Sequence, residues 1–292
     1  MKPARPPLLI MSLPRSGSSW VAEILGSAPE ALFLREPINQ SHLACGGATT
    51  VFDIDPAAPP PCYAQFATRA FAGIPAFPAG VVRDARQWKL TRRTRGRVVV
   101  KEVNPLALAW LLDTYRPRIV FLMRHPAAVA LSYEALNWCN AEAKLAELGA
   151  RLMDSSLRPW QETIQSVTGF WRAHGAFQGA VLHVALQALT AYADARIVTY
   201  ESLCENPEAG FRALFEFAGL TFDDRVRDHI GESSIGTAQD TAGHYGTRRN
   251  TLRMAAAWKG KLTPEQLAGL HAGYAAFDLP YYRGDDHWTL AA

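Results

Sequence analysis

A turn rich in small and basic residues follows the first apolar run of the chain. In LLIMSLPRSGSSW, residues 8–20, the run stops at Pro14, Arg15 follows, and Gly17, Ser18 and Ser19 precede an amphipathic helix. The first N–H groups of a helix lack intrahelical partners, and the helix dipole adds partial positive charge there. Arginine adds a full charge and several donors. The segment therefore predicts a phosphate-binding turn, with an ordinary turn capped at Ser18 as the alternative.

The same turn lacks the features that a nucleotide kinase needs. A kinase or ATPase would carry G-x-x-x-x-G-K-[ST] here. The chain instead reads PRSGSSW at 14–20, with no lysine before the serine pair and no helix hydroxyl placed for magnesium. We therefore expect a phosphate cradle without γ-phosphate machinery and without a metal.

A second cationic junction lies at RIVFLMRHPAAVALSY, residues 118–133. An apolar run ends at Arg124, a helix starts at a proline, and Ser132 follows eight residues after the arginine. That spacing crosses the strand end and about two helical turns. Both side chains could therefore reach one anion beside the helix start.

The apolar runs indicate the scaffold that positions these two junctions. Four runs rich in β-branched residues are nearly continuous rather than alternating, as expected of strands covered by helices on both faces. They lie at 8–13, 97–103, 118–123 and 195–200. Helical patterns separate the runs, so the sequence predicts an α/β protein, a three-layer sandwich around a central parallel sheet. We expect one domain over residues 1–292.

Two helices have clear end signals. Asn206 and Pro207 form a helix start that Gly219 ends, and Thr263 with Gln266 forms a capping box. The segments 41–96 and 134–192 fit the strand–helix alternation less well. The first is rich in proline and glycine, and the second is helical in character. We interpret both as insertions over the acceptor site.

Composition excludes several function classes. A net charge of +3 with dispersed arginine and lysine does not indicate nucleic-acid binding. No apolar stretch reaches the 18 or so residues that span a membrane, so we expect a cytoplasmic protein without a transmembrane segment. The cysteines form no CxxC pair, which favours free thiols in a reducing compartment. A Cys45–Cys62 disulfide is the alternative.

The motifs together resemble the sulfotransferases that use 3′-phosphoadenosine 5′-phosphosulfate (PAPS). PRSGSSW is similar to the loop with which that family binds the 5′-phosphosulfate, and Arg124 with Ser132 matches its 3′-phosphate pattern. The resemblance implies a P-loop-like sulfotransferase fold, PAPS as co-substrate and 3′,5′-ADP as product. It implies donor contacts from each residue of the loop after its proline: Arg15, Ser16, Gly17, Ser18, Ser19 and Trp20.

The resemblance extends toward the C-terminus. The stretch from ARIVTYESL onward is similar to a family segment that would bring Tyr200 near the adenine. The segment before Trp258 departs from the family's Arg-Lys-Gly triplet and offers Arg248, Arg249 and Arg253 instead. We expect one of these arginines, with Arg248 and Arg249 preferred, to bind the 3′-phosphate.

Sulfuryl transfer also needs a base and a cation. The histidine that serves aryl- and steroid-sulfating members is missing from VVVKEVNPL, so the resemblance turns to the glutamate of carbohydrate- and tyrosine-sulfating members. Glu36 matches it, and partial burial is expected to raise its pKa. A surface ion pair with Arg35 is the alternative. Lys101 ends an apolar run and would neutralise the reacting group.

Weaker candidates for the base are Glu102, His42 and His244. The acceptor is expected to be a carbohydrate or another small aliphatic alcohol, or an amine. Two other functions remain open at this point. One is a P-loop-type small-molecule kinase, and the other is a nucleotide-binding module without catalysis.

Overall fold

A computed structural model describes most of the chain. The described residues are 5–93, 95–138, 140–152, 156–234 and 251–290, and no side chain is described at 234 or 251–253. The chain forms two compact units. Unit 1 comprises Met1–Met123 and Tyr192–Met254, and unit 2 comprises Arg124–Ala191 and Ala255–Ala292.

The core of unit 1 is a five-stranded, all-parallel sheet with the order β2-β3-β1-β4-β5. Its strands are β1 (Leu8–Ser12), β2 (Ala31–Arg35), β3 (Arg97–Glu102), β4 (Arg118–Met123) and β5 (Ala195–Thr199). The predicted α/β fold with a central parallel sheet is confirmed. The strand β2 is additional to the four predicted strands, because its apolar run of four residues is too short to stand out.

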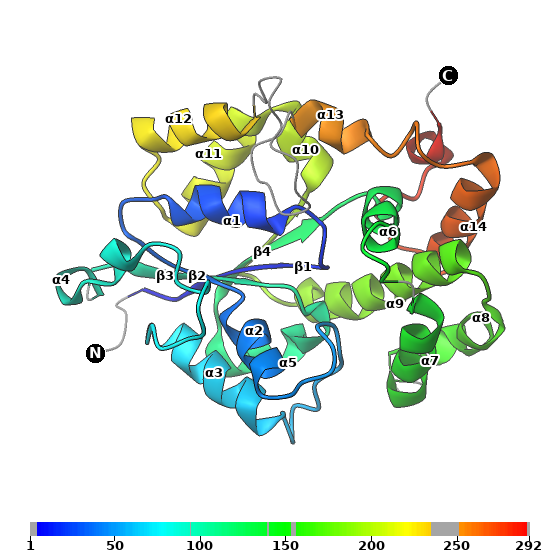
Figure 1. Ribbon diagram of the computed structural model, residues 1–292, viewed down its shortest axis with the longest axis horizontal. Coiled ribbons are helices and arrows are strands. Elements are labelled where there is room, and N and C mark those ends of the chain that lie inside the picture. Colours follow the sequence, from blue (N-terminus) through cyan, green and yellow to red (C-terminus); the bar gives the residue numbers. More distant parts are fainter. Residues whose placement is uncertain (1–4, 94, 139, 153–155, 235–250, 291–292) are drawn as a thin grey trace. The chain divides into compact units, whose positions relative to one another are not determined.

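Helices cover both faces of this sheet, which explains why the first four strands are buried almost throughout. In Figure 1, one face carries α1 (Ser18–Gly26), α11 (Pro207–Ala218) and α12 (Asp224–Ser234). The opposite face carries α2 (Pro37–Ala44), α3 (Pro61–Phe71) and α5 (Leu108–Tyr115). The shorter elements are η1 (Ala85–Trp88), α4 (Leu90–Arg93), η2 (Pro105–Ala107), α10 (Tyr200–Glu205) and α13 (Thr251–Ala256).

The two ends of α11 follow the sequence signals. The Asn206 side chain accepts a hydrogen bond from the Ala209 amide, and Gly219 ends the helix in the left-handed conformation at φ 59°. Three guanidinium groups then donate to carbonyl oxygens at this C-terminus, from Arg5, Arg97 and Arg118. Cations at a helix C-terminus oppose the negative end of the dipole.

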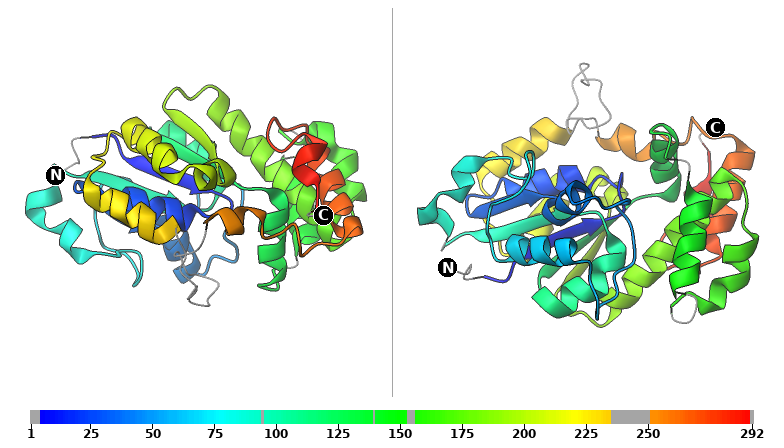
Figure 2. Two further views of the ribbon diagram at one scale, coloured as in Figure 1. Left: turned by 90° about the horizontal axis from the view of Figure 1, so that it is seen from above. Right: turned by 60° about the horizontal axis from the view of Figure 1, so that its bottom comes forward.

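Unit 2 is helical. It contains α6 (Pro126–Glu134), α7 (Ala141–Leu152), η3 (Arg158–Trp160), α8 (Gln161–Ser166), α9 (Phe170–Thr190), α14 (Pro264–Ala275) and η4 (Asp285–Trp288). The predicted capping box of Thr263 and Gln266 starts α14. Helices α9 and α14 lie side by side (Figure 2). They approach closely at Gly175 and Gly273, where backbone of the partner helix occupies the space of a β-carbon.

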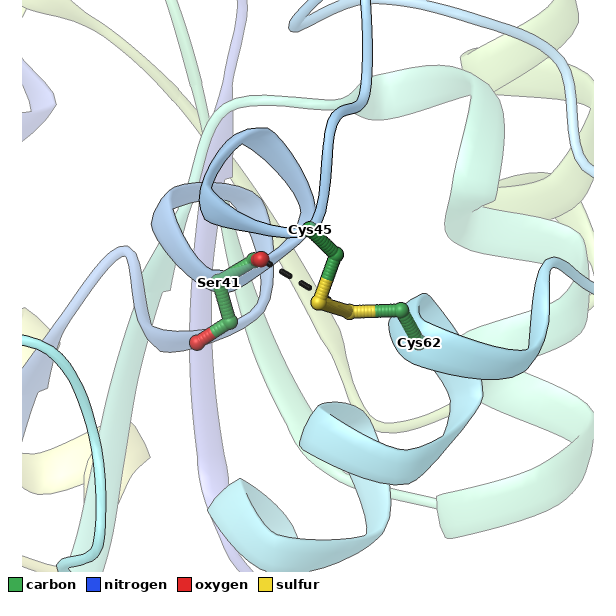
Figure 3. The surroundings of a disulfide bond; sticks show 3 residues. All are labelled: Ser41, Cys45 and Cys62. Carbon is green, nitrogen blue, oxygen red and sulfur yellow. Dashed lines mark hydrogen bonds between the residues drawn. A yellow bond between two sulfur atoms is a disulfide. The ribbon is translucent and has the colours of Figure 1, made fainter.

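Segment 41–96 consists of loops and short helices, as expected, but its cysteines differ from the prediction. Cys45 at the end of α2 and Cys62 in the first turn of α3 form a disulfide, with Cα atoms 6.6 Å apart. The Cys62 sulfur lies 3.6 Å from the Ser41 carbonyl oxygen (Figure 3). The expectation of free thiols was therefore wrong for this pair, because the fold brings together two helix ends that the sequence separates by a proline-rich loop. Cys204 is free and buried.

No helix among the described residues is both long and apolar enough to cross a membrane.

Candidate functional site

The turn after β1 has the geometry of an anion cradle. Arg15 and Gly17 both adopt positive φ angles, 70° and 90°, and Gly17 caps α1 without a side-chain hydrogen bond. The helix therefore starts with Ser18 directly after a left-handed residue, which differs from the alternative of a cap at Ser18. The Ser18 hydroxyl is hydrogen-bonded to that of Ser12 at 2.8 Å. The bond joins the first residue of α1 to the end of β1, and the first amides of α1 lie next to it as donors.

The aromatic side chains of Trp20 and Tyr200 pack against this loop. A β-carbon at Gly17 would lie 2.5 Å from the Tyr200 ring, so the ring occupies the space beside the glycine. Tyr200 meets Trp20 edge to face with centroids 5.6 Å apart. The Trp20 indole nitrogen donates to the Ser233 hydroxyl at 3.0 Å. Both rings are less than a tenth exposed, so in this structure they pack against the loop. The predicted adenine contact of Tyr200 stays a prediction.

Glu36 and Lys101 come together at the carboxyl edge of the sheet. In the register of β2 and β3, Arg35 lies opposite Lys101, and the Glu36 amide donates to the Lys101 carbonyl at 2.7 Å. The Lys101 ammonium donates to Glu36 Oε1 in an ion pair. The alternative of a surface pair with Arg35 is not what the structure shows. Because β1 neighbours β3 in the same parallel sheet, the phosphate turn and this pair follow adjacent strand ends.

The charge state of Glu36 differs from the expectation. Burial acts to raise its pKa, but the Lys101 ammonium, its hydrogen bond and the Arg35 charge together outweigh burial, so the pKa is lowered. Lys101 is 3% exposed at its side chain, which leaves little water to screen the pair. Glu36 is therefore ionised at neutral pH and held by its cation.

Glu102 lies next to this pair and is wholly buried. Its Oε1 accepts hydrogen bonds from the backbone amides of Ile38 at 2.7 Å and Asn39 at 3.4 Å, in the first turn of α2. Burial, and then the negative charge of Glu36, raises the pKa of Glu102 to about 8. The sequence supported Glu102 only as a second-rank base, and no sequence signal indicated its contact with α2.

The second predicted junction belongs to unit 2. Arg124 follows β4 directly, His125 caps α6 by accepting from the Ala127 amide, and Ser132 lies in the second turn of α6. Both Arg124 and Ser132 are half-buried. Arg248, Arg249 and His244 lie outside the described residues, and the side chain of Arg253 is likewise not described.

Aromatic residues of segment 41–96 pack beside α2. His42 stacks on Phe52 with centroids 4.6 Å apart, and burial lowers its pKa. Phe52 is clamped by Asn104, which accepts from its amide and donates to its carbonyl oxygen. Asn104 follows β3 two residues after Glu102. This clamp was not predicted, and its signal in the sequence is only a polar residue just past an apolar run.

Comparison with known proteins identifies the family. The model of the sulfotransferase family matches residues 6–224. Human carbohydrate sulfotransferase 5 is 26% identical over 351 aligned positions, which cover 98% of this chain and 84% of that protein. Human carbohydrate sulfotransferase 6 is 27% identical over 305 positions, covering 89% and 76%.

Solved structures agree at the level of the fold. The sulfotransferase domain of the Synechococcus PCC 7002 olefin synthase superposes with a TM-score of 0.50 at 16% identity, covering 96% of this chain and 98% of that domain. The sulfotransferase domain of the curacin biosynthetic pathway also gives 0.50, at 14% identity, covering 96% and 100%. The P-loop-like sulfotransferase fold that the sequence implied is therefore confirmed.

Proposed function

Since the chain belongs to the sulfotransferase family and is therefore a transferase, we propose that it moves the sulfuryl group of PAPS to a hydroxyl group, with Glu36 as general base. The observation that carries the proposal is the buried Lys101–Glu36 ion pair at the strand end beside the phosphate turn. It supplies a carboxylate and a cation at one place, which are the two groups that in-line sulfuryl transfer requires. The kinase alternative is not carried forward, because the turn and the family both favour sulfotransfer.

The turn suits the donor's 5′-phosphate. Gly17 lets the loop pack against the Tyr200 ring at a positive φ, the amides at the start of α1 are donors, and the half-buried Arg15 lies three residues after β1. In our proposal Arg15 and the residues from Ser16 to Ser19 hold the phosphosulfate. Arg124 and Ser132 keep the role that their motif predicts, which is recognition of the 3′-phosphate. One arginine from the pair Arg248 and Arg249 is proposed to add to it.

The transfer step follows from these groups. The acceptor oxygen attacks sulfur as the bond from sulfur to the 5′-phosphate oxygen breaks, and the hydroxyl proton passes to Glu36. The leaving phosphate takes the bonding electron pair, and Lys101 and Arg15 neutralise its charge. Lys101 thus has two roles, because in the free protein it also forms the ion pair that lowers the pKa of Glu36. We infer that Lys101 turns from Glu36 to the sulfuryl group when the donor binds, which removes the cation that lowers the pKa of the base.

The acceptor class rests on the base and on the relatives. Two of the relatives are named carbohydrate sulfotransferases. We propose a saccharide hydroxyl, with a small aliphatic alcohol as the second choice, and segments 41–96 and 134–192 as the parts that recognise it. The clamped Phe52 beside α2 is a suitable apolar surface for a sugar ring.

Ligand binding and transfer are tested separately. In a thermal-shift assay we expect 3′,5′-ADP to raise the melting temperature, while ATP with magnesium does not. PAPS is then incubated with a panel of saccharides, alcohols and amines, and sulfated products are identified by mass spectrometry. Glu36→Gln is expected to lower kcat by about 10³-fold with 3′,5′-ADP binding intact. Glu23→Gln on α1 serves as the control. Transfer at the wild-type rate by Glu36→Gln would remove Glu36 as the base.

A further inference from the structure

Glu36 occupies the N-cap position of α2, but its side chain does not cap the helix. It is the N-cap residue of α2, with φ 51° and ψ 45°, and its side chain makes no capping hydrogen bond. An N-cap side chain normally turns back and accepts from the second or third amide of its helix. Here the Glu36 carboxylate instead faces Lys101. The first amides of α2 therefore need another acceptor.

Glu102 is that acceptor. Its Oε1 receives the amides of Ile38 and Asn39, which are the second and third residues of α2. The contact joins residues more than sixty positions apart, from the end of β3 to the start of a helix on the sheet face. A buried amide without a partner is costly, so this contact ties the helix start to the strand.

The contact closes a small frame around Glu36. Before the helix, the Glu36 amide donates to the Lys101 carbonyl oxygen. After Glu36, the first turn of α2 donates to Glu102, the residue that follows Lys101. Glu36 is thereby held in a left-handed conformation that a non-glycine residue rarely adopts. Such strain persists only where surrounding contacts impose it.

The raised pKa of Glu102 is consistent with a role in holding the start of α2. Burial and the charge of Glu36 raise the pKa of Glu102, so this carboxyl group is largely neutral at pH 7. A neutral carboxyl still accepts hydrogen bonds but adds little negative charge beside the base. The charged groups that act on it are Glu36 and Lys101. Burial, and then the charge of Glu102, raises the pKa of Tyr63 on α3.

We propose that Glu102 is a positioning residue, which caps α2 in place of Glu36 and so frees and fixes the Glu36 carboxylate for proton transfer. The structural part of this inference concerns the helix start alone. Its catalytic consequence rests on the proposed function.

Three substitutions separate the tasks of Glu102. Glu102→Gln keeps an oxygen acceptor for α2, so we expect kcat within about 10-fold of wild type. Glu102→Leu removes the acceptor at similar volume, and the loosened base should lower kcat about 100-fold. Glu102→Asp is too short to reach the amides and should fall between the two. In all three, the KM for PAPS and the Kd for 3′,5′-ADP should stay within about 2-fold of wild type, because the phosphate turn is untouched.

Glu30 provides a matched control. Its Oε1 also accepts a backbone amide, that of Thr221, at 2.7 Å. Glu30 directly precedes β2 and Thr221 lies in the loop after α11, so this contact is at the end of β2 opposite to the proposed base. Glu30→Leu should therefore leave kcat unchanged. If Glu102→Leu does not fold, Glu102→Asp and Glu102→Gln decide, since the first should lose more activity than the second.

Hydrogen exchange tests the structural part without any catalysis. The amides of Ile38 and Asn39 should exchange at least about 10-fold faster in Glu102→Leu than in wild type, while the amide of Ile24 in α1 stays protected. Unchanged exchange at Ile38 and Asn39 would overturn the inference. So would wild-type kcat in Glu102→Leu, or a parallel loss of kcat and 3′,5′-ADP affinity. If the wild-type protein transfers no sulfuryl group, the proposed function fails, and the exchange result still decides whether Glu102 holds α2.

Discussion

At the residue scale, the chemistry is concentrated in side chains whose usual conformations or charge states are altered by neighbours. Arg15 and Glu36 both adopt positive φ angles, which ordinary side chains avoid. Glu36 is paired with Lys101 and Glu102 follows Lys101 in β3, and the pKa values of the two carboxyl groups move in opposite directions. Two carboxyl groups with separated pKa values can take different roles, one as a base and one as a neutral hydrogen-bond acceptor.

Lys101→Met tests how the base is tuned. Burial already raises the pKa of Glu36 more than any single interaction lowers it, so loss of the Lys101 charge and hydrogen bond should let that pKa rise. Transfer requires ionised Glu36, so the acidic limb of the kcat/KM profile should move to higher pH. At pH 8 kcat should also fall by about 10²-fold or more, because the leaving phosphate loses its cation. The exposed Lys89→Met is the control. An acidic limb that stays in place in Lys101→Met would contradict the proposed tuning.

Gly17→Ala tests the cradle. The added methyl group would collide with the Tyr200 ring and would also sit at φ 90°. We expect 3′,5′-ADP affinity to drop about 100-fold as the loop shifts, measured by calorimetry. Gly80→Ala has nearly the same φ, 89°, with nothing within 4 Å of its β-carbon, so it carries the backbone strain without the collision. Equal effects from the two substitutions would show that strain, rather than packing against Tyr200, matters.

At the element scale, the carboxyl ends of parallel strands gather residues that are far apart in the chain. The loop after β1, Glu36 after β2 and Lys101 near the end of β3 all lie at one edge, because the order β2-β3-β1 makes these strands neighbours. In unit 2, close helix packing positions the elements. There α9 and α14 approach so closely that glycine is required at the crossing.

Gly273→Ala tests that crossing. Its β-carbon would fall on the Arg172 carbonyl oxygen and 2.8 Å from the Ala176 amide nitrogen, so the helices must separate. We expect the free energy of unfolding to decrease by about 2–3 kcal/mol in urea titrations. Gly269→Ala, on the same helix, meets nothing closer than 3.7 Å and should be neutral or gain up to about 1 kcal/mol from helix propensity. Similar losses in both variants would refute the close-packing argument.

At the scale of the whole molecule, the disulfide bears on where the protein works. Disulfides persist mainly in oxidising compartments, whereas the sequence led us to expect the cytoplasm. The cytoplasmic location stays a prediction, and the Cys45–Cys62 bond makes it testable. Rapid alkylation of intact cells followed by mass spectrometry would show whether the two sulfurs are bonded in the native compartment.

Removal of the disulfide should also reduce stability. The bond joins residues 17 apart in the chain, and closing a loop of that size restricts the unfolded state by about 3 kcal/mol. Cys45→Ser with Cys62→Ser should therefore lower the melting temperature, and dithiothreitol should lower that of the wild type but not that of the double variant. A wild-type melting temperature that does not respond to dithiothreitol, in protein whose thiols are shown to be reduced, would count against this role.

Several local features of the chain could be predicted from the sequence, because each signal is confined to a short stretch. The continuous apolar runs predicted four of the five strands, and small and basic residues at 14–20 predicted the turn. Asn206, Gly219 and the capping box predicted helix ends correctly for the same reason. Each depends only on hydrogen bonds and backbone angles within a few residues.

What only the tertiary structure decided involves partners distant in sequence. Glu36 and Lys101 are separated by 65 positions and meet because β2 pairs with β3 in one particular register. The same register places Glu102 against α2, and the fold brings Cys45 to Cys62. The direction of the Glu36 pKa shift also follows from these contacts, since burial alone acts the other way. Periodicity can show that a strand exists, but strand order and register arise from packing of the whole sheet, and they determine which charges become neighbours.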